Sequence, residues 1–168
     1  MNQRIAIIGL PGSGKSTFAT KLGEALNLPV HHLDKLMFEG RSKRNREEFL
    51  AMHQSLIQQE SWIIEGCSTS TFESRFARAD TVIYFGLHRF ICMGRVLKRL
   101  FSFDKALCKD TGCLDTVNQG LLRYIWNFKK DKKPNIDTLI QRFPHLTYYE
   151  LNSSKDVDAC FHRLSKRS

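Results

Sequence analysis

The stretch Gly9-Leu10-Pro11-Gly12-Ser13-Gly14-Lys15-Ser16 matches the pattern GxxxxGK[ST]. An apolar run at residues 4–8 precedes it, and a segment with apolar side chains at helical spacing follows it to about residue 26. A glycine-rich turn between a strand and a helix is typical of phosphate-binding loops, because glycine accepts positive φ angles and its amide groups close around phosphate oxygens. A plain glycine-rich turn is the alternative. The pattern in this context predicts a nucleotide triphosphate site.

Each residue type in this loop fits that chemistry. We expect Lys15 to reach the β- and γ-phosphates and the Ser16 hydroxyl to bind Mg²⁺. The helix that begins near Lys15 adds unpaired amide groups and about half a positive charge at its start. The implied cofactors are ATP and Mg²⁺. The residues expected to hold the nucleotide in this loop are Gly9, Pro11, Gly12, Ser13, Gly14, Lys15, Ser16 and Thr17.

Short apolar runs alternate with helical patterns along the whole chain. This alternation is typical of a parallel sheet with helices on both faces, so we expect a three-layer α/β fold. With 168 residues, the chain (1–168) is expected to form one domain. The polar, basic residues 35–45 predict a mobile loop, and a helix that includes residues 121–128 is expected to stop before Pro134. Strands are expected at residues 4–8, 29–33, 62–65, 81–85 and 146–151.

The composition limits the class of protein. The chain is 42% hydrophobic and 26% charged, which fits a soluble globular protein. Most of its net charge of +9 falls between residues 86 and 133, which indicates an anionic partner: nucleotide, nucleic acid or lipid. Five cysteines without a CxxC pair favour a reducing compartment. Because no apolar run is long enough to span a membrane, we expect a cytoplasmic protein with no membrane partner. The oligomeric state stays open.

Two acidic residues end predicted strands beside the phosphate loop. Asp34 follows residues 29–33, and Glu65 ends residues 62–65. Ligands of open α/β sheets bind at the carboxyl ends of the strands, so both side chains should face the γ-phosphate. We assign Asp34 to aligning an acceptor hydroxyl, and Glu65 with Ser16 to holding Mg²⁺. A helix N-cap is the alternative role for Asp34.

Basic side chains are expected on the other side of the phosphates. Arg95 and Arg99 lie four residues apart on a predicted helix, so they share a face and could neutralise charge on a transferring phosphoryl group. A solvated basic face is the alternative. His32 is more simply a packed strand histidine than a partner of Asp34. Three further arginines could clamp an anionic acceptor or belong to a mobile basic loop: Arg41, Arg44 and Arg46.

Five segments, spread along nearly the whole chain, form a distinctive set: the phosphate loop, His32-Leu33-Asp34, Trp62-Ile63-Ile64-Glu65-Gly66, residues 77–85 and Trp126-Asn127-Phe128. These segments resemble the bacterial DNA topology modulation protein family, small P-loop proteins similar to adenylate kinase. The resemblance implies the fold of nucleoside monophosphate kinases, with strand order 2-3-1-4-5 and a helical lid at about residues 95–120. It also implies that adenine lies near Asn152, Ser153 and Lys155.

The chain departs from two related groups of kinases. Adenylate kinases follow the third strand with Asp-Gly-x-Pro-Arg, whereas this chain reads Glu65-Gly66-Cys67-Ser68-Thr69 and lacks the AMP-binding arginine. Shikimate kinases carry a second aspartate two residues after the first, where this chain has Leu36, and a glycine triplet that this chain lacks. The acceptor therefore stays unidentified.

Three functions remain. The favoured one is an ATP-dependent kinase that transfers the γ-phosphoryl group to a small hydroxyl or phosphate acceptor, such as a nucleotide or nucleoside. The second is an ATP-binding regulator with little turnover. The third is a nucleic-acid-associated ATP-binding protein, which the basic segment and the family's name suggest. Nucleic acid is possible but not favoured as a partner, because the chain has no recognised DNA-reading helix pattern.

Overall fold

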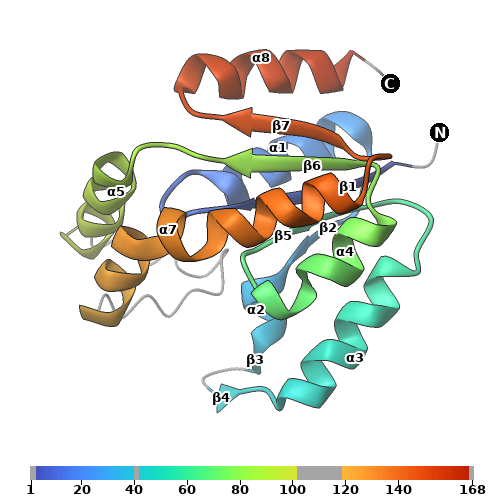
Figure 1. Ribbon diagram of the computed structural model, residues 1–168, viewed down its shortest axis with the longest axis horizontal. Coiled ribbons are helices and arrows are strands. Elements are labelled where there is room, and N and C mark those ends of the chain that lie inside the picture. The colour runs from blue at the N-terminus through green and yellow to red at the C-terminus, as the bar shows by residue number, and fades with distance from the viewer. Residues whose placement is uncertain (1–2, 40–41, 102–118, 167–168) are drawn as a thin grey trace.

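The computed structural model describes residues 3–39, 42–101 and 119–166. Five parallel strands form its central sheet in the order β2-β5-β1-β6-β7 (Figure 1). Leaving aside a separate two-stranded hairpin, this is the predicted order 2-3-1-4-5, so the three-layer α/β fold is confirmed. The strands are β1 (Arg4–Gly9), β2 (Val30–His32), β5 (Trp62–Glu65), β6 (Thr81–Phe85) and β7 (Thr147–Leu151).

Apolar residues on both faces of the sheet give the molecule two cores. Along β1, Ile5 and Ile7 pack into one core while Ala6 and Ile8 pack into the other, as the two-residue period of a strand requires. Helices α1 (Lys15–Leu26) and α8 (Ser154–Ser165) cover the first face. The second face is covered by α3 (Arg46–Ile57), α4 (Phe72–Arg78), α5 (Arg89–Phe101) and α7 (Gln119–Arg142). Within the described residues, no helix is long and apolar enough to cross a membrane.

The predicted mobile loop at residues 35–45 is wrong where the structure describes it. Helix α2 (Leu33–Met37) follows β2 directly, and β3 (Phe38–Glu39) then pairs antiparallel with β4 (Ser42–Lys43). Leu33 is fully buried and anchors α2 on the core. After the hairpin, Arg44 donates from its backbone to the Met37 carbonyl and from its side chain to the Leu36 carbonyl. These contacts order a segment whose polar composition indicated a loop.

The prediction that a helix stops before Pro134 is also wrong. Helix α7 continues through this proline to Arg142. An interior proline costs about 3 kcal/mol of helix stability. Beyond it, Ile136 and Leu139 are buried in the core, and burying two such side chains contributes about 1.5–3 kcal/mol each. Packing therefore offsets the local cost, and the helix continues.

Helices α3 and α4 bring two buried basic side chains together. His53 of α3 is 1% exposed and Arg75 of α4 is fully buried. Burial and the nearby charge of Arg75 lower the pKa of His53 to about 4. His53 is therefore neutral at pH 7 in the folded protein.

This burial of His53 predicts acid sensitivity. Between pH 6.5 and about 4, the unfolded chain binds a proton at this histidine and the folded chain does not. The free energy of unfolding should therefore decrease as the pH is lowered through that window. This histidine accounts for a decrease of up to roughly 3 kcal/mol. Urea unfolding across the window measures the loss. The His53→Gln variant should lose less over the same range; an equal loss in both proteins would contradict the assignment.

Candidate functional site

The phosphate loop joins β1 to α1 at the carboxyl edge of the sheet. Gly12 and Gly14 have φ angles of +76° and +96°, which favour glycine. A Cβ on Gly12 would lie 2.6 Å from the Cys92 carbonyl oxygen of α5, so this part of the loop tolerates no side chain. At Gly14 the nearest such contact is Arg95 Nη1 at 3.7 Å, which leaves that side open.

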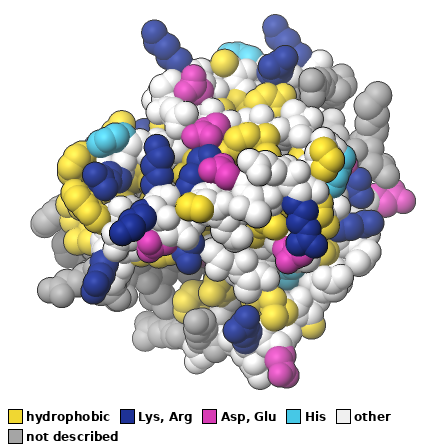
Figure 2. Space-filling view, viewed as in Figure 1, with side chains coloured by type: hydrophobic (Ala, Val, Ile, Leu, Met, Phe, Trp, Pro, Cys, Tyr) yellow, Lys and Arg dark blue, Asp and Glu magenta, His cyan; other side chains and the backbone are white. Residues whose placement is uncertain are grey.

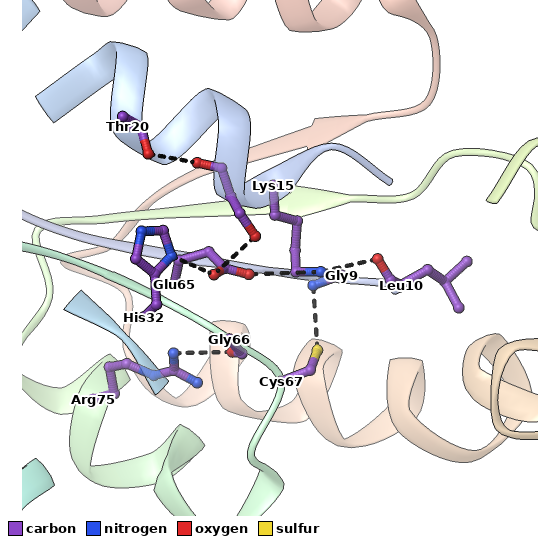
Figure 3. Close-up of polar contacts among 10 residues, drawn as sticks. Gly9, Leu10, Lys15, Thr20, His32, Glu65, Gly66, Cys67 and Arg75 are labelled. Carbon is purple, nitrogen blue, oxygen red and sulfur yellow. Dashed lines mark hydrogen bonds and ion pairs between the residues drawn. The ribbon is translucent and has the colours of Figure 1, made fainter. Parts of the chain in front are cut away.

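The buried carboxylate of Glu65 lies at the centre of the polar contacts beside this loop (Figure 3). Lys15 Nζ donates to the Leu10 carbonyl at 2.9 Å and lies 3.7 Å from Glu65 Oε1. Glu65 Oε2 accepts a hydrogen bond from Ser16 Oγ at 3.2 Å and lies 3.0 Å from His32 Nδ1. Side chains from the start of α1 and from the end of β2 thus converge on the carboxylate at the end of β5.

Glu65 is charged at neutral pH. Burial favours its protonated form, but the hydrogen bond to His32, the charge of Lys15 and the hydrogen bond from Ser16 together hold its pKa below the usual value. A charged carboxylate and a hydroxyl 3.2 Å apart offer the oxygen ligands that Mg²⁺ prefers. Magnesium bound together with a nucleotide usually takes only one or two carboxylates from the protein. The described residues agree with such a site, because they contain no cluster of three or more His, Cys, Asp or Glu side chains.

The loop also fits a phosphate. Ser13 Oγ is buried and has no hydrogen-bond partner among the described residues. An unpaired buried hydroxyl is costly unless a ligand or water satisfies it. The other predicted loop residues lie along the same connection: Gly9 ends β1, Pro11 lies in the turn, and Thr17 is exposed in the first turn of α1. The residues present therefore fit a nucleotide triphosphate with its Mg²⁺.

His32 contributes to the site, although the sequence favours a packed strand histidine. Its Nδ1 lies 3.0 Å from Glu65 Oε2. The parallel register of β2 and β5 places His32 directly opposite Glu65, which explains the contact. The predicted strand order makes these two strands neighbours. Each ends in a polar residue, His32 or Glu65, and this was the feature of the sequence that could have indicated their contact.

Asp34 lies in the first turn of α2 rather than at the end of a strand. It is half-buried, and its charge reaches Arg75. The N-cap of α2 is His32, so the structure does not place Asp34 in the alternative role of N-cap. Its assignment to the acceptor stays a prediction.

Of the two predicted arginines of α5, the structure brings Arg95 to the phosphate loop. Its Nη1 donates to the Ser13 carbonyl at 3.2 Å. Arg99 lies in the same helix, but its side chain is outside the described part of the chain. Residues 102–118, which form most of the predicted lid at 95–120, and Arg41 are also outside it.

The residues predicted to lie near adenine form the exposed connection between β7 and α8. Ser153 caps α8: its Oγ accepts from the Asp156 amide at 3.2 Å. The Asp156 carboxylate accepts in turn from the amides of Asn152 and Ser153 at 3.0 and 2.8 Å. Lys155 is exposed in the first turn of α8. Helix capping thus accounts for Ser153, and contact with a base stays a prediction for all three.

Cys67 borders the site. Its Sγ accepts a hydrogen bond from the Gly9 amide at 3.3 Å. Burial raises the pKa of the Cys67 thiol, so it is protonated at neutral pH and is a poor nucleophile. The structure thus gives Cys67 a contact with the loop and no activated state.

A cavity of about 350 Å³ lies beside the hairpin and the turn after β5. Arg44 on its wall is ion-paired with Glu39 at 3.6 Å and with Glu48. Arg46 is exposed and has no ion pair in the portion of the chain that is described. The lining residues are Met37, Arg44, Arg46, Phe49, Ser68 and Ser70.

Comparisons with known proteins agree with this geometry at the level of the fold. No family model and no curated protein matches the chain. Among solved structures, shikimate kinase from Bacteroides thetaiotaomicron is similar, with a TM-score of 0.61 and 16% identity over 98% of this chain and 97% of that one. The chain has the fold of small P-loop kinases.

Two further structures with this kinase fold agree. A gluconokinase from Sinorhizobium meliloti 1021 has a TM-score of 0.56 and 15% identity, covering 99% of this chain and 95% of that one. A candidate kinase from Chloroflexus aurantiacus j-10-fl has a TM-score of 0.57 and 15% identity, covering all of both chains. Similarity to small P-loop kinases is therefore shown by structure, while membership of the DNA topology modulation family stays a prediction.

Proposed function

We propose that this protein is an ATP-dependent kinase that transfers the γ-phosphoryl group of ATP to a small acceptor. The observation that carries the proposal is the convergence of Lys15, Ser16 and His32 on the buried, charged carboxylate of Glu65. A structural role alone does not explain why a phosphate loop would gather these groups at the ligand-binding edge of the sheet.

Each of the chain's own groups has a defined task in this proposal. Lys15 and the loop amides hold the phosphates, and Ser16 with Glu65 holds the metal. The bound Mg²⁺ supplies neutralising charge to the phosphate oxygens. Asp34 aligns the acceptor hydroxyl for in-line attack. Arg95, with Arg99 on the same helix, stabilises charge on the transferring group.

The acceptor would enter the cavity lined by α3, the hairpin and the turn after β5. Its volume of about 350 Å³ suits a small metabolite. Arg44 is already ion-paired with two glutamates, so among the described residues of this wall Arg46 is the cation without an ion pair. Ser68 and Ser70 add hydroxyl groups. These groups favour an acceptor that carries a phosphate or carboxylate as well as the reacting group.

ATP consumption with Mg²⁺ across a panel of nucleoside monophosphates, nucleosides and small hydroxy acids tests the proposal. We expect one acceptor class to accelerate turnover in the wild type, and Asp34→Asn to lose that acceleration while still binding ATP, because the acceptor hydroxyl is no longer aligned. Acceptor-independent hydrolysis throughout the panel would contradict the kinase proposal and favour the regulator.

No observation favours the nucleic-acid-associated function over the kinase. On the face shown in Figure 2, Lys and Arg side chains are scattered among acidic and apolar ones. Part of the basic segment 86–133 lies outside the described residues. If DNA does bind, its affinity should fall steeply with salt as counterions are released.

A further inference from the structure

A buried arginine lies beside the turn that carries Glu65. Arg75 of α4 is fully buried, and its Nη1 donates to the Gly66 carbonyl at 3.0 Å (Figure 3). Its Nε and Nη2 have no hydrogen-bond partner among the described residues. The guanidinium also lies 5.4 Å from the centre of the Phe72 ring. Burying a charge with so few partners is costly.

The turn that Arg75 contacts links three parts of the site. Gly66 has a φ of +140°, and its amide donates to the Ile7 carbonyl of β1 at 3.1 Å. The next residue, Cys67, accepts the Gly9 amide of the phosphate loop. A Cβ on Gly66 would lie 2.8 Å from Leu33 Cβ, so the turn also packs against α2 next to Asp34.

The charges around Arg75 point the same way. Burial lowers the pKa of Arg75 to about 10, while the negative charges of Glu65 and Asp34 oppose this shift. Arg75 therefore stays protonated at neutral pH. A positive charge is held inside the protein within electrostatic reach of both candidate carboxylates.

We propose that Arg75 is a positioning residue: by holding the Gly66 carbonyl, it fixes the turn 65–67 so that Glu65 faces Ser16 and Cys67 receives the loop amide. This inference rests on the proposed function, since it assigns Glu65 to the metal. Arg75 touches neither nucleotide nor acceptor. It acts through the backbone of the turn.

If Arg75 only stabilised the fold, its replacement would change the stability of the protein but not the metal-dependent binding of ATP by the folded protein. A buried charge carries a desolvation cost that an apolar side chain of similar size avoids. The Arg75→Met protein should therefore fold, and its function should separate from its stability. The matched control is Arg78→Met, because Arg78 lies in the same helix and also donates to a backbone carbonyl. Its partner is the Ile57 carbonyl, at 3.3 Å. Ile57 is the last residue of α3 and lies outside the turn that carries Glu65.

The test measures ATP dissociation constants in EDTA and in Mg²⁺ for the wild type and four variants: Arg75→Met, Arg75→Gln, Arg75→Lys and Arg78→Met. The ratio of the two constants is the metal-dependent gain in affinity. The amide resonances of Gly9, Gly66 and Cys67 in the nucleotide-free proteins give a second readout that needs no activity. Urea unfolding gives the stability of each variant.

We expect Arg75→Met to lower the metal-dependent gain by about tenfold, the size of effect seen when a hydrogen bond from a charged group is lost. The Gly9, Gly66 and Cys67 amides should shift in this variant. Arg75→Gln, whose side chain is too short to reach the same carbonyl, should give the same two results as Arg75→Met. It serves as the test of the positioning role if Arg75→Met does not fold. Arg75→Lys, which keeps the charge and a donor, should restore part of the gain, and Arg78→Met should change neither readout.

A gain within twofold of wild type together with unshifted amides, in a folded Arg75→Met or Arg75→Gln protein, would overturn the positioning role. Failure of the proposed function looks different, because the wild type itself would then show no ATP binding. In that case the amide resonances alone decide whether Arg75 holds the turn.

Discussion

Lys15→Met should abolish tight binding of ATP·Mg²⁺ and reduce ATP turnover by roughly 10²–10³-fold, because one buried cation at the phosphates contributes several kcal/mol. Lys15 is only 8% exposed, and its Nζ lies between the Leu10 carbonyl and the Glu65 carboxylate. A triphosphate in the loop would therefore meet this amine directly. Calorimetric titration with ATP·Mg²⁺ and a coupled turnover assay measure the two effects.

Lys21→Met is the matched control for that experiment. Lys21 belongs to the same helix α1 but is exposed, so both affinity and turnover should stay close to wild type. If Lys15→Met bound and hydrolysed ATP like the wild type, the phosphate loop would not be the nucleotide site and the whole proposal would fall.

Glu65→Gln should reduce the rate of phosphoryl transfer by roughly 10²–10³-fold, because metal-assisted charge stabilisation is worth several kcal/mol. The glutamine keeps the shape of the side chain and an oxygen that can accept from Ser16, but it removes the charge held between Lys15 and His32. ATP affinity measured in EDTA should change little. Single-turnover transfer rates with the identified acceptor, or ATP hydrolysis rates before one is known, provide the measurement.

The control for Glu65→Gln is Glu24→Gln, an exposed glutamate of α1 that should leave the rate unchanged. The kinase and the regulator give opposite results here. A regulator that binds ATP with little turnover would keep its output in Glu65→Gln, so unchanged output would favour that function over the kinase.

The sheet could be predicted from the sequence because local patterns determine it. Each strand is a short apolar run between helical segments, and the phosphate loop places the first strand next to the first helix. The strand order came from the family resemblance. The two errors, at α2 and at Pro134, have a common cause: buried residues distant in the sequence outweigh local preference. Leu33 orders a polar segment, and Ile136 with Leu139 carries a helix past a proline.

The candidate site was predictable only in part, for a physical reason. The loop residues and Glu65 follow from a motif and from the carboxyl ends of strands. His32 and Arg75 do not, since their contacts depend on register and on which face of a helix is inward. An arginine in the sequence Phe72-Glu73-Ser74-Arg75-Phe76 indicates a surface position, because arginine is almost never fully buried. The burial of Arg75 becomes evident only from the packing of α4 in the folded protein.

The close packing of Gly12 against α5 connects the phosphate loop to a helix that contacts a surface tryptophan. The Cys92 carbonyl and Val96 leave no room above Gly12, so a movement of the loop toward α5 would have to displace that helix. At the start of that helix, Arg89 lies 3.9 Å above the Trp126 ring and Phe90 contacts its edge. Trp126 is 45% exposed, whereas Trp62, the other tryptophan, is fully buried in β5. We therefore expect nucleotide binding at the loop to change the fluorescence of Trp126, without any added label.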